Sequence, residues 1–217
     1  LAGAGAMTGL LRRLAAQAVE PARRERRTQR CELCAEPLPA VHRHLLELAG
    51  RELRCACRAC QVLFDHAAAG GGHYRLVPER RWRLSGFRLN EGAWARLRAP
   101  VRTVFLIHDS DTGDPVLYYP SPAGAVQAPA DRSAWELLRR DNPVLRELEP
   151  DVEALLVDSE AWMVPVDDCY ALVGAIRAHW RGLTGGKDVR EHITRFFTDL
   201  GGRSVTVPAA GSDRSPA

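Results

Sequence analysis

The sequence predicts an α+β protein, in which a small N-terminal hairpin module resembling a zinc ribbon precedes an α+β domain with a mainly antiparallel sheet. Two observations support this fold class. Five of the six cysteines lie within thirty residues, at spacings typical of metal sites. Further along, short apolar segments alternate with segments whose apolar residues recur every three or four positions, as expected for strands and helices. At 217 residues, 46% hydrophobic and 26% charged, the chain is long enough for one domain plus a small module.

Residues 1–30 are predicted to be a basic, partly disordered N-terminal segment. A short amphipathic helix is expected from residue 8 to Pro21, and the arginine-rich stretch 23–27 follows it. Residues 1–60 carry 11 arginines against 6 acidic residues, whereas the rest of the chain carries 19 basic against 21 acidic residues. The basic segment would suit an acidic partner, but a solvated, mobile lead-in is the simpler interpretation.

Cysteine spacing predicts a metal site within residues 31–66. Cys31 and Cys34 form one pair and Cys57 and Cys60 the other, in the pattern C-x2-C-x22-C-x2-C. Each two-residue spacing lets a tight turn point both sulfurs at one ion, and two turns supply the four thiolates that tetrahedral Zn²⁺ prefers. Strands at 41–48 and 51–55, joined by a turn containing glycine, are expected to carry these turns. Residues 31–66 are therefore predicted to be a four-cysteine module similar to a zinc ribbon.

The ligand set and the metal each have an alternative. Cys55 lies two positions before Cys57 on the same expected strand, so it either replaces Cys57 as ligand or is a spare thiol. His42 and His44 are also ligand types, but four sulfurs already fill the shell, so both are expected to be surface residues. Iron is the alternative to zinc, although neither turn is followed by the glycine usual in iron sites. A disulfide framework is disfavoured because the sequence shows no signal peptide, and a cytoplasmic location is expected.

The α+β domain is predicted to span residues 74–200, after a glycine-rich joint at 66–73. Residues 61–65 are expected to continue the second strand of the module. The clearest hairpin of the domain joins the expected strands 101–108 and 115–120 through the turn 109–114. The expected strands of the domain are 74–78, 81–84, 101–108, 115–120, 153–158 and 161–166.

Helices are predicted at 90–97, 132–140, 144–148, 168–183 and 189–200, with caps at Asn90, Asp131, Asn142 and Asp167. The helices 132–140 and 168–183 are expected to pack on one face of the sheet, and Cys169 to be a buried residue of the second helix. Residues 203–217 are predicted to be a disordered tail. The expected core consists of Trp135, Leu138, Leu155, Trp162, Leu172, Val173, Ile176, Trp180 and Phe197.

No catalytic signature is present, and we expect no enzyme activity. The sequence lacks a P-loop, a dinucleotide-binding glycine fingerprint, a nucleophile elbow and a zincin helix. The adjacent carboxylates Asp167 and Asp168 are explained by the start of a helix. The loop 109–114 departs from a calcium loop, because Gly113 and Pro120 stand where that motif needs other residues. No apolar run approaches the ~20 residues of a membrane-spanning helix.

Several motifs of this sequence are distinctive: the two cysteine turns with HRHLLEL at 42–48, and the segments 119–124, 142–157, 164–174 and 179–182. They resemble an uncharacterised protein family found mainly in actinobacteria, whose genes lie beside those of high-affinity nickel-iron uptake hydrogenases. The resemblance spans about residues 31–200. It implies a metal-binding accessory or assembly protein that acts as a protein-interaction module and binds a hydrogenase subunit or maturation factor. The alternatives are an iron electron carrier similar to rubredoxin and a nucleic-acid-binding zinc ribbon; the slightly acidic residues 61–217 argue against nucleic acid.

Overall fold

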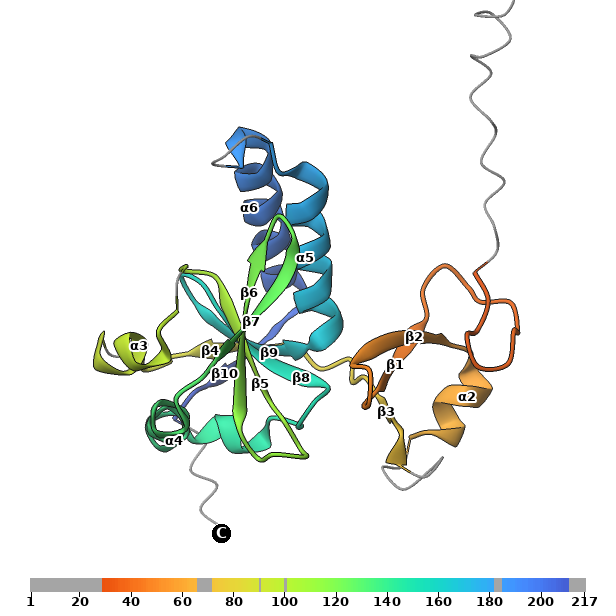
Figure 1. Ribbon diagram of the computed structural model, residues 1–217, viewed down its shortest axis with the longest axis horizontal. Helices are drawn as coiled ribbons and strands as arrows, with labels where there is room; N and C mark the ends of the chain where they lie inside the picture. Colours follow the sequence, from red (N-terminus) through yellow and green to blue (C-terminus); the bar gives the residue numbers. More distant parts are fainter. Residues whose placement is uncertain (1–28, 66–71, 90, 100, 182–184, 211–217) are drawn as a thin grey trace, which may run out of the picture.

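The structure, a computed structural model, describes residues 29–65, 72–89, 91–99, 101–181 and 185–210. These residues form a three-stranded sheet with strand order β2-β1-β3 and a seven-stranded sheet with order β10-β4-β9-β8-β5-β6-β7 (Figure 1). Within both sheets the strands pair antiparallel, except that β10 runs parallel to β4. The α+β class with a mainly antiparallel sheet is confirmed. The helix expected near residues 8–21, most of the glycine-rich joint and the Asn90 cap lie outside the described residues.

The three-stranded sheet and one short helix make up the metal module, defined here as residues 29–76. Strands β1 (Arg43–Glu47) and β2 (Glu52–Ala56) form the predicted hairpin. Helix α2 (Arg58–Leu63) follows at once, so the prediction that residues 61–65 extend the second strand is wrong. The helix begins because the N–H of Gln61 donates to the oxygen of Cys57 at 2.9 Å, which closes its first turn. Strand β3 (Tyr74–Leu76) pairs with β1, so residue 74 belongs to the sheet of the module.

The two faces of the hairpin have different neighbours, because successive side chains of a strand point to opposite faces. Leu45 is buried in a cluster with the cysteine turns. Its neighbour Leu46, together with Leu53 directly opposite on β2, packs into the core of the larger sheet. The hairpin is therefore shared between the metal module and the α+β domain, which lie side by side in Figure 1.

The larger sheet contains two strands that the sequence analysis does not assign. One is β7, which pairs with β6 after a tight turn. The other is β10, which forms where a disordered tail is expected, and pairs with β4 at the edge of the sheet. The strands are β4 (Trp82–Ser85), β5 (Val104–His108), β6 (Pro115–Ser121), β7 (Gly124–Pro129), β8 (Glu153–Val157), β9 (Ala161–Pro165) and β10 (Val205–Pro208).

Helices cover both faces of this sheet, so the prediction that two of them share one face is wrong. Trp135, from the helix at 132–141, packs in one cluster with Leu106 of β5. Ile176, from the helix at 166–179, packs in another cluster with Phe105 and Ile107, whose side chains point the other way from the same strand. The elements are α3 (Glu91–Leu97), α4 (Arg132–Asp141), the 3-10 helix η2 (Pro143–Glu147), α5 (Val166–His179) and α6 (Gly186–Arg203).

The expected core is largely confirmed. Of the expected helix caps that lie within the described residues, only Asp131 is confirmed. Seven of the nine expected core residues are buried; Trp180, just after α5, and Phe197 are half-buried. Asp131 caps α4 by accepting the N–H of Ser133 at 2.8 Å. Asn142 stands before η2 but its side chain does not cap that helix, because it bonds the backbone of Arg88 and the oxygen of Leu138 at the end of α4. Asp167 lies in the first turn of α5, which begins two residues earlier than expected.

The described residues contain no helix with both the length and the apolar composition needed for a membrane span.

Candidate metal centre

Four thiols of the metal module lie close enough together to share one ion. One ligand atom from each of Cys31, Cys34, Cys57 and Cys60 lies within 4.8 Å of every other. The Sγ atoms of Cys31 and Cys60 are 3.7 Å apart, and those of Cys34 and Cys57 are 3.5 Å apart. Tetrahedral zinc with Zn–S bonds of about 2.3 Å separates its sulfurs by about 3.8 Å, whereas a disulfide would hold them about 2.05 Å apart. The spacing therefore matches a metal site, and all four thiols are free.

Two different local structures position these thiols. In the first turn, the N–H of Ala35 donates to the oxygen of Cys31 at 2.8 Å, and the N–H of Cys31 donates to Glu36. Ala35 adopts a left-handed conformation with φ 64°. In the second, β2 ends at Ala56, Cys57 remains extended, and α2 brings Cys60 round to the same side. A strand end and a helix start thus replace the second hairpin turn expected from the spacing.

The cluster is mostly enclosed. Cys31, Cys57 and Cys60 are buried, and Leu45 and Ala56 of the hairpin pack against them. Cys34 alone among these four cysteines is exposed. Four protein sulfurs leave no position for a substrate, so the donor set and its enclosure suit a structural ion.

The protonation states of these thiols differ with their surroundings. Burial opposes the charged form of Cys31, yet backbone N–H groups, that of Cys57 first, lower its pKa to about 6. Burial raises the pKa of Cys60 strongly, and the neighbouring thiols raise it further. Without metal, Cys31 is therefore more readily ionised than Cys60. Because a metal binds thiolates, loading the site must release protons.

Cys55 lies on the other face of the hairpin, directly opposite His44. It is grouped with His42 and His44, whose ligand atoms and the Cys55 sulfur lie within 4.8 Å of one another. Cys55 and the buried Ala56 point to opposite faces of β2. Cys57, two positions after Cys55, joins the four-thiol cluster because β2 ends at Ala56 and α2 begins at Arg58. Both histidines are half-buried, and His44 bonds Asp167 of α5, which the sequence analysis explained only as a cap.

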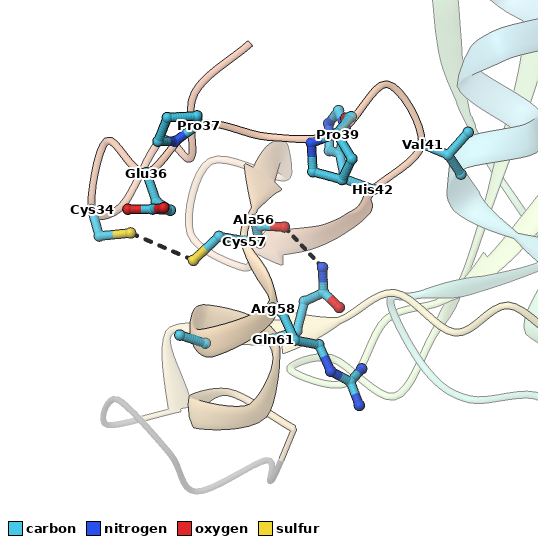
Figure 2. Close-up of a pocket in the computed structure, with 11 residues that line it drawn as sticks. Cys34, Glu36, Pro37, Pro39, Val41, His42, Ala56, Cys57, Arg58 and Gln61 are labelled. Carbon is cyan, nitrogen blue, oxygen red and sulfur yellow. Dashed lines mark hydrogen bonds between the residues drawn. The ribbon is translucent and has the colours of Figure 1, made fainter. Parts of the chain in front are cut away.

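A pocket of about 590 Å³ borders the four-thiol cluster (Figure 2). Cys34 and Cys57 line it on one side, and His42 lines it from the segment that precedes β1. Pro39 and Val41 add apolar surface, and the Val41 side chain is 90% exposed. The metal centre thus lies beside an open, partly apolar surface.

Charged side chains join the module to the larger sheet. Arg51, in the hairpin turn, forms an ion pair with Asp109 and lies 3.6 Å from the carboxylate of Asp151. Arg75 of β3 also reaches Asp151, at 3.3 Å, and that carboxylate is buried. A buried carboxylate needs such partners, because removing an unpaired charge from water is costly. These residues hold the module in one orientation.

A profile of DUF5947, described as a family of unknown function, matches residues 30–204. No curated protein and no solved structure matches the chain significantly. The matched range includes both cysteine turns, the hairpin between them and nine of the ten strands named above, and it covers more than half of the chain. The chain therefore belongs to the DUF5947 family of unknown function.

Proposed function

We propose that Cys31, Cys34, Cys57 and Cys60 bind one Zn²⁺, and that the metal module so formed is the protein-docking part of a hydrogenase accessory protein. The observation that carries the zinc site is the pair of Sγ separations, 3.7 and 3.5 Å, within one cluster of four thiols. Tetrahedral sets of four sulfurs select zinc or iron. Iron is the alternative, and the two metals are distinguished by colour and by elemental analysis.

Zinc would stabilise a module that has little core of its own. Its helix α2 has six residues and its sheet three strands. A segment this small buries too little apolar surface to fold unaided, so metal binding supplies part of its folding free energy. The other face of the hairpin rests on the α+β domain, which leaves the cysteine side of the module for a partner.

An apolar surface on the module supports docking to a protein. Val41 is 90% exposed, and it lines the pocket with Pro37 and Pro39; these three residues are named the module patch. Val62 and Leu63 of α2 are also more than half exposed. Contiguous exposed apolar residues of this kind typically mark interaction surfaces.

The arginines of the hairpin contribute less to docking than their number in the sequence indicates. Arg51 pairs with Asp109, and Arg54 with Glu47 and Glu52. The outer edge of β2 is also partly covered, because the N–H of Glu32 donates to the oxygen of Cys55 at 2.9 Å. The module patch, rather than these charges or this edge, is therefore the surface we assign to the partner.

The proposed partner is a subunit of a nickel-iron hydrogenase or one of its maturation factors, as the family resemblance implies. Tagged protein isolated from cells that make the hydrogenase should recover one of these proteins. Val41→Asp should abolish recovery, because a charge placed in an apolar contact must lose its hydration. Val205→Asp is the matched control, since Val205 is 64% exposed on β10 at the edge of the larger sheet.

Recovery of no hydrogenase component, together with normal hydrogenase activity in a deletion strain, would contradict the proposed partner. Equal recovery with both aspartate variants would contradict the assignment of the module patch. Cys31→Ser should also abolish recovery while circular dichroism shows that the α+β domain is still folded. That result would place the contact on the metal module.

A further inference from the structure

A second group of metal-ligand side chains lies beside the four thiols, and its Cys55 packs against the four-thiol cluster. It consists of His42, His44 and Cys55, whose ligand atoms lie within 4.8 Å of one another. His44 and Cys55 are cross-strand partners of β1 and β2, and the ring centroids of the two histidines are 5.1 Å apart. A regular antiparallel pair thus holds two of the three side chains, and the third is two residues along the chain.

Hydrogen bonds orient both imidazole rings. His42 Nδ1 lies 3.0 Å from the carbonyl oxygen of Pro39. A carbonyl oxygen can only accept, so Nδ1 carries the proton and Nε2 keeps its lone pair. His44 Nδ1 lies 2.8 Å from Asp167 Oδ2, and an ionised carboxylate likewise requires Nδ1 to donate. In the neutral form of each ring, Nε2 is therefore the nitrogen left to bind a metal.

This arrangement is the one that surrounds histidine ligands in metal proteins. A ligating imidazole almost always donates its other N–H to a carboxylate or a backbone carbonyl, which fixes its tautomer and orientation. Here one ring has the carbonyl and the other the carboxylate. Moreover, His42 Nε2 is buried and has no hydrogen-bond partner among the described residues. A buried nitrogen with a free lone pair has lost its hydration without compensation, and a metal ion would restore a bond to it.

Nearby charges favour a cation. Asp167 is bonded to His44, and the Glu32 carboxylate accepts the backbone N–H of Cys55 at 2.6 Å. Arg54 offsets part of this charge, since it lies 3.7 Å from Glu32.

We propose that His42, His44 and Cys55 form a second, three-ligand site for a divalent transition metal such as Zn²⁺, named here the hairpin-face site. Two imidazoles and one thiolate suit this class of ion, and three protein ligands leave a fourth position for water or for a donor from a partner. His42 also lines the pocket of about 590 Å³, so the site borders a space large enough for such a donor. The hairpin-face site does not depend on the function proposed above, because it shares no ligand with the four-thiol cluster.

The test is the number of zinc ions bound by the full chain. Metal-free protein titrated with Zn²⁺ and examined by native mass spectrometry should bind two ions. His42→Ala and Cys55→Ser should each reduce this to one. His179→Ala should still bind two ions, which makes it the matched control. His179 on α5 stacks on His192 of α6, with ring centroids 3.4 Å apart. Neither histidine belongs to a metal-ligand group in the part of the chain that the structure describes.

Titration with Co²⁺ reports which ligands are lost. The site with four thiolates gives the stronger sulfur-to-cobalt absorption, and the hairpin-face site adds a weaker contribution from one thiolate. Cys55→Ser should remove only the weaker part. Binding of a single ion, or binding of two ions by Cys55→Ser and His42→Ala, would overturn the proposal. A third result would also overturn the proposal: Cys55→Ser loses both ions while His42→Ala retains both. Cys55 would then be a ligand of the four-thiol site.

Discussion

His44 Nδ1 lies 2.8 Å from Asp167 Oδ2, so the hairpin that carries the cysteines is hydrogen-bonded directly to the first turn of α5. The two residues are 123 positions apart in the sequence. On the same side, Leu46 and Leu53 extend the core of the larger sheet into the module. The metal module is thus fixed on the α+β domain.

Asp167→Asn should weaken Zn²⁺ binding at the hairpin-face site about 10–100-fold, the usual effect of removing a group that orients a metal ligand. The four-thiol ion should be retained, because Asp167 bonds none of its ligands in the described structure. Competition with a coloured chelator measures both affinities. Asp199→Asn, which changes an exposed carboxylate of α6, is the control and should leave both unchanged. Unchanged binding in Asp167→Asn would show that the hydrogen bond to His44 does not support a metal.

Ala35→Gly should stabilise the metal module. Ala35 has φ 64°, a left-handed conformation that costs a residue with a Cβ roughly 1–2 kcal/mol and glycine almost nothing. Glycine also loses more chain entropy on folding, so a net gain of about 0.5–1 kcal/mol should remain, measured by urea unfolding at one fixed Zn²⁺ concentration. Ala59→Gly is the control, because Ala59 lies in α2, where glycine should lower stability. Destabilisation by both variants would show that the turn is not strained.

Trp162→Ala should lower the free energy of unfolding by about 3–5 kcal/mol, the usual cost of removing a buried tryptophan side chain. Trp162 is 2% exposed on β9, and its ring lies 5.1 Å from that of Phe197 on α6. Val205→Ala, at an exposed position of the edge strand, should change stability by less than about 0.5 kcal/mol. Chemical denaturation of both proteins at one metal concentration gives the comparison. Equal effects would contradict the packing of α6 on the sheet.

Acid should weaken the joint between the module and the larger sheet through Asp109. Burial of Asp109 opposes its charge, but the Thr112 and Asp111 N–H groups and the Arg51 guanidinium together lower its pKa below the usual value of 3.8. Because the pKa of Asp109 is lower in the folded protein than in the unfolded chain, its ionised form stabilises the fold. This stabilisation is complete at pH values above the pKa of the unfolded chain, and it is lost as the pH falls through the pKa of the folded protein.

Urea unfolding at a series of pH values checks this prediction. Stability of the natural protein should fall as the pH drops below about 4, and Asp109→Asn should be less stable near neutral pH with a shallower fall in that acidic range. Asp111→Asn is a suitable control, because its exposed side chain forms no ion pair with the described residues and should leave the profile unchanged. Parallel profiles for the natural protein and Asp109→Asn would contradict the ionic role of Asp109.

Local sequence patterns predict much of this fold. The hairpin at 43–56, the strands of the larger sheet between Trp82 and Ser121, and helices α4 and α6 follow from turn residues and apolar spacing. The capping role of Asp131 also follows, because it depends only on the next two residues. The four-thiol cluster is equally local, since one short turn, one hairpin and the helix that follows it determine it.

What could not be predicted depends on contacts between distant segments. The spacing of Cys55 and Cys57 does not show that a helix starts at Arg58, which is what separates these two thiols. The composition of β10 and its flanking residues is typical of a disordered tail, and the strand forms because it pairs with β4. The placement of the helices does have a signal in the sequence: β8 is an almost continuous apolar run, which is typical of a strand covered on both faces. This run indicates helices on both sides of the sheet, as α4 and α5 are found.

The central claim is that one Zn²⁺ is bound by Cys31, Cys34, Cys57 and Cys60, and its most direct test is X-ray absorption at the zinc edge. The protein should carry Cys55→Ser, so that only the four-thiol site is loaded. The account predicts one zinc ion per chain with four sulfur neighbours at about 2.3 Å, and loss of that ion when Cys57→Ser is added. Nitrogen or oxygen neighbours in the shell, iron in place of zinc, or no stoichiometric metal would contradict it.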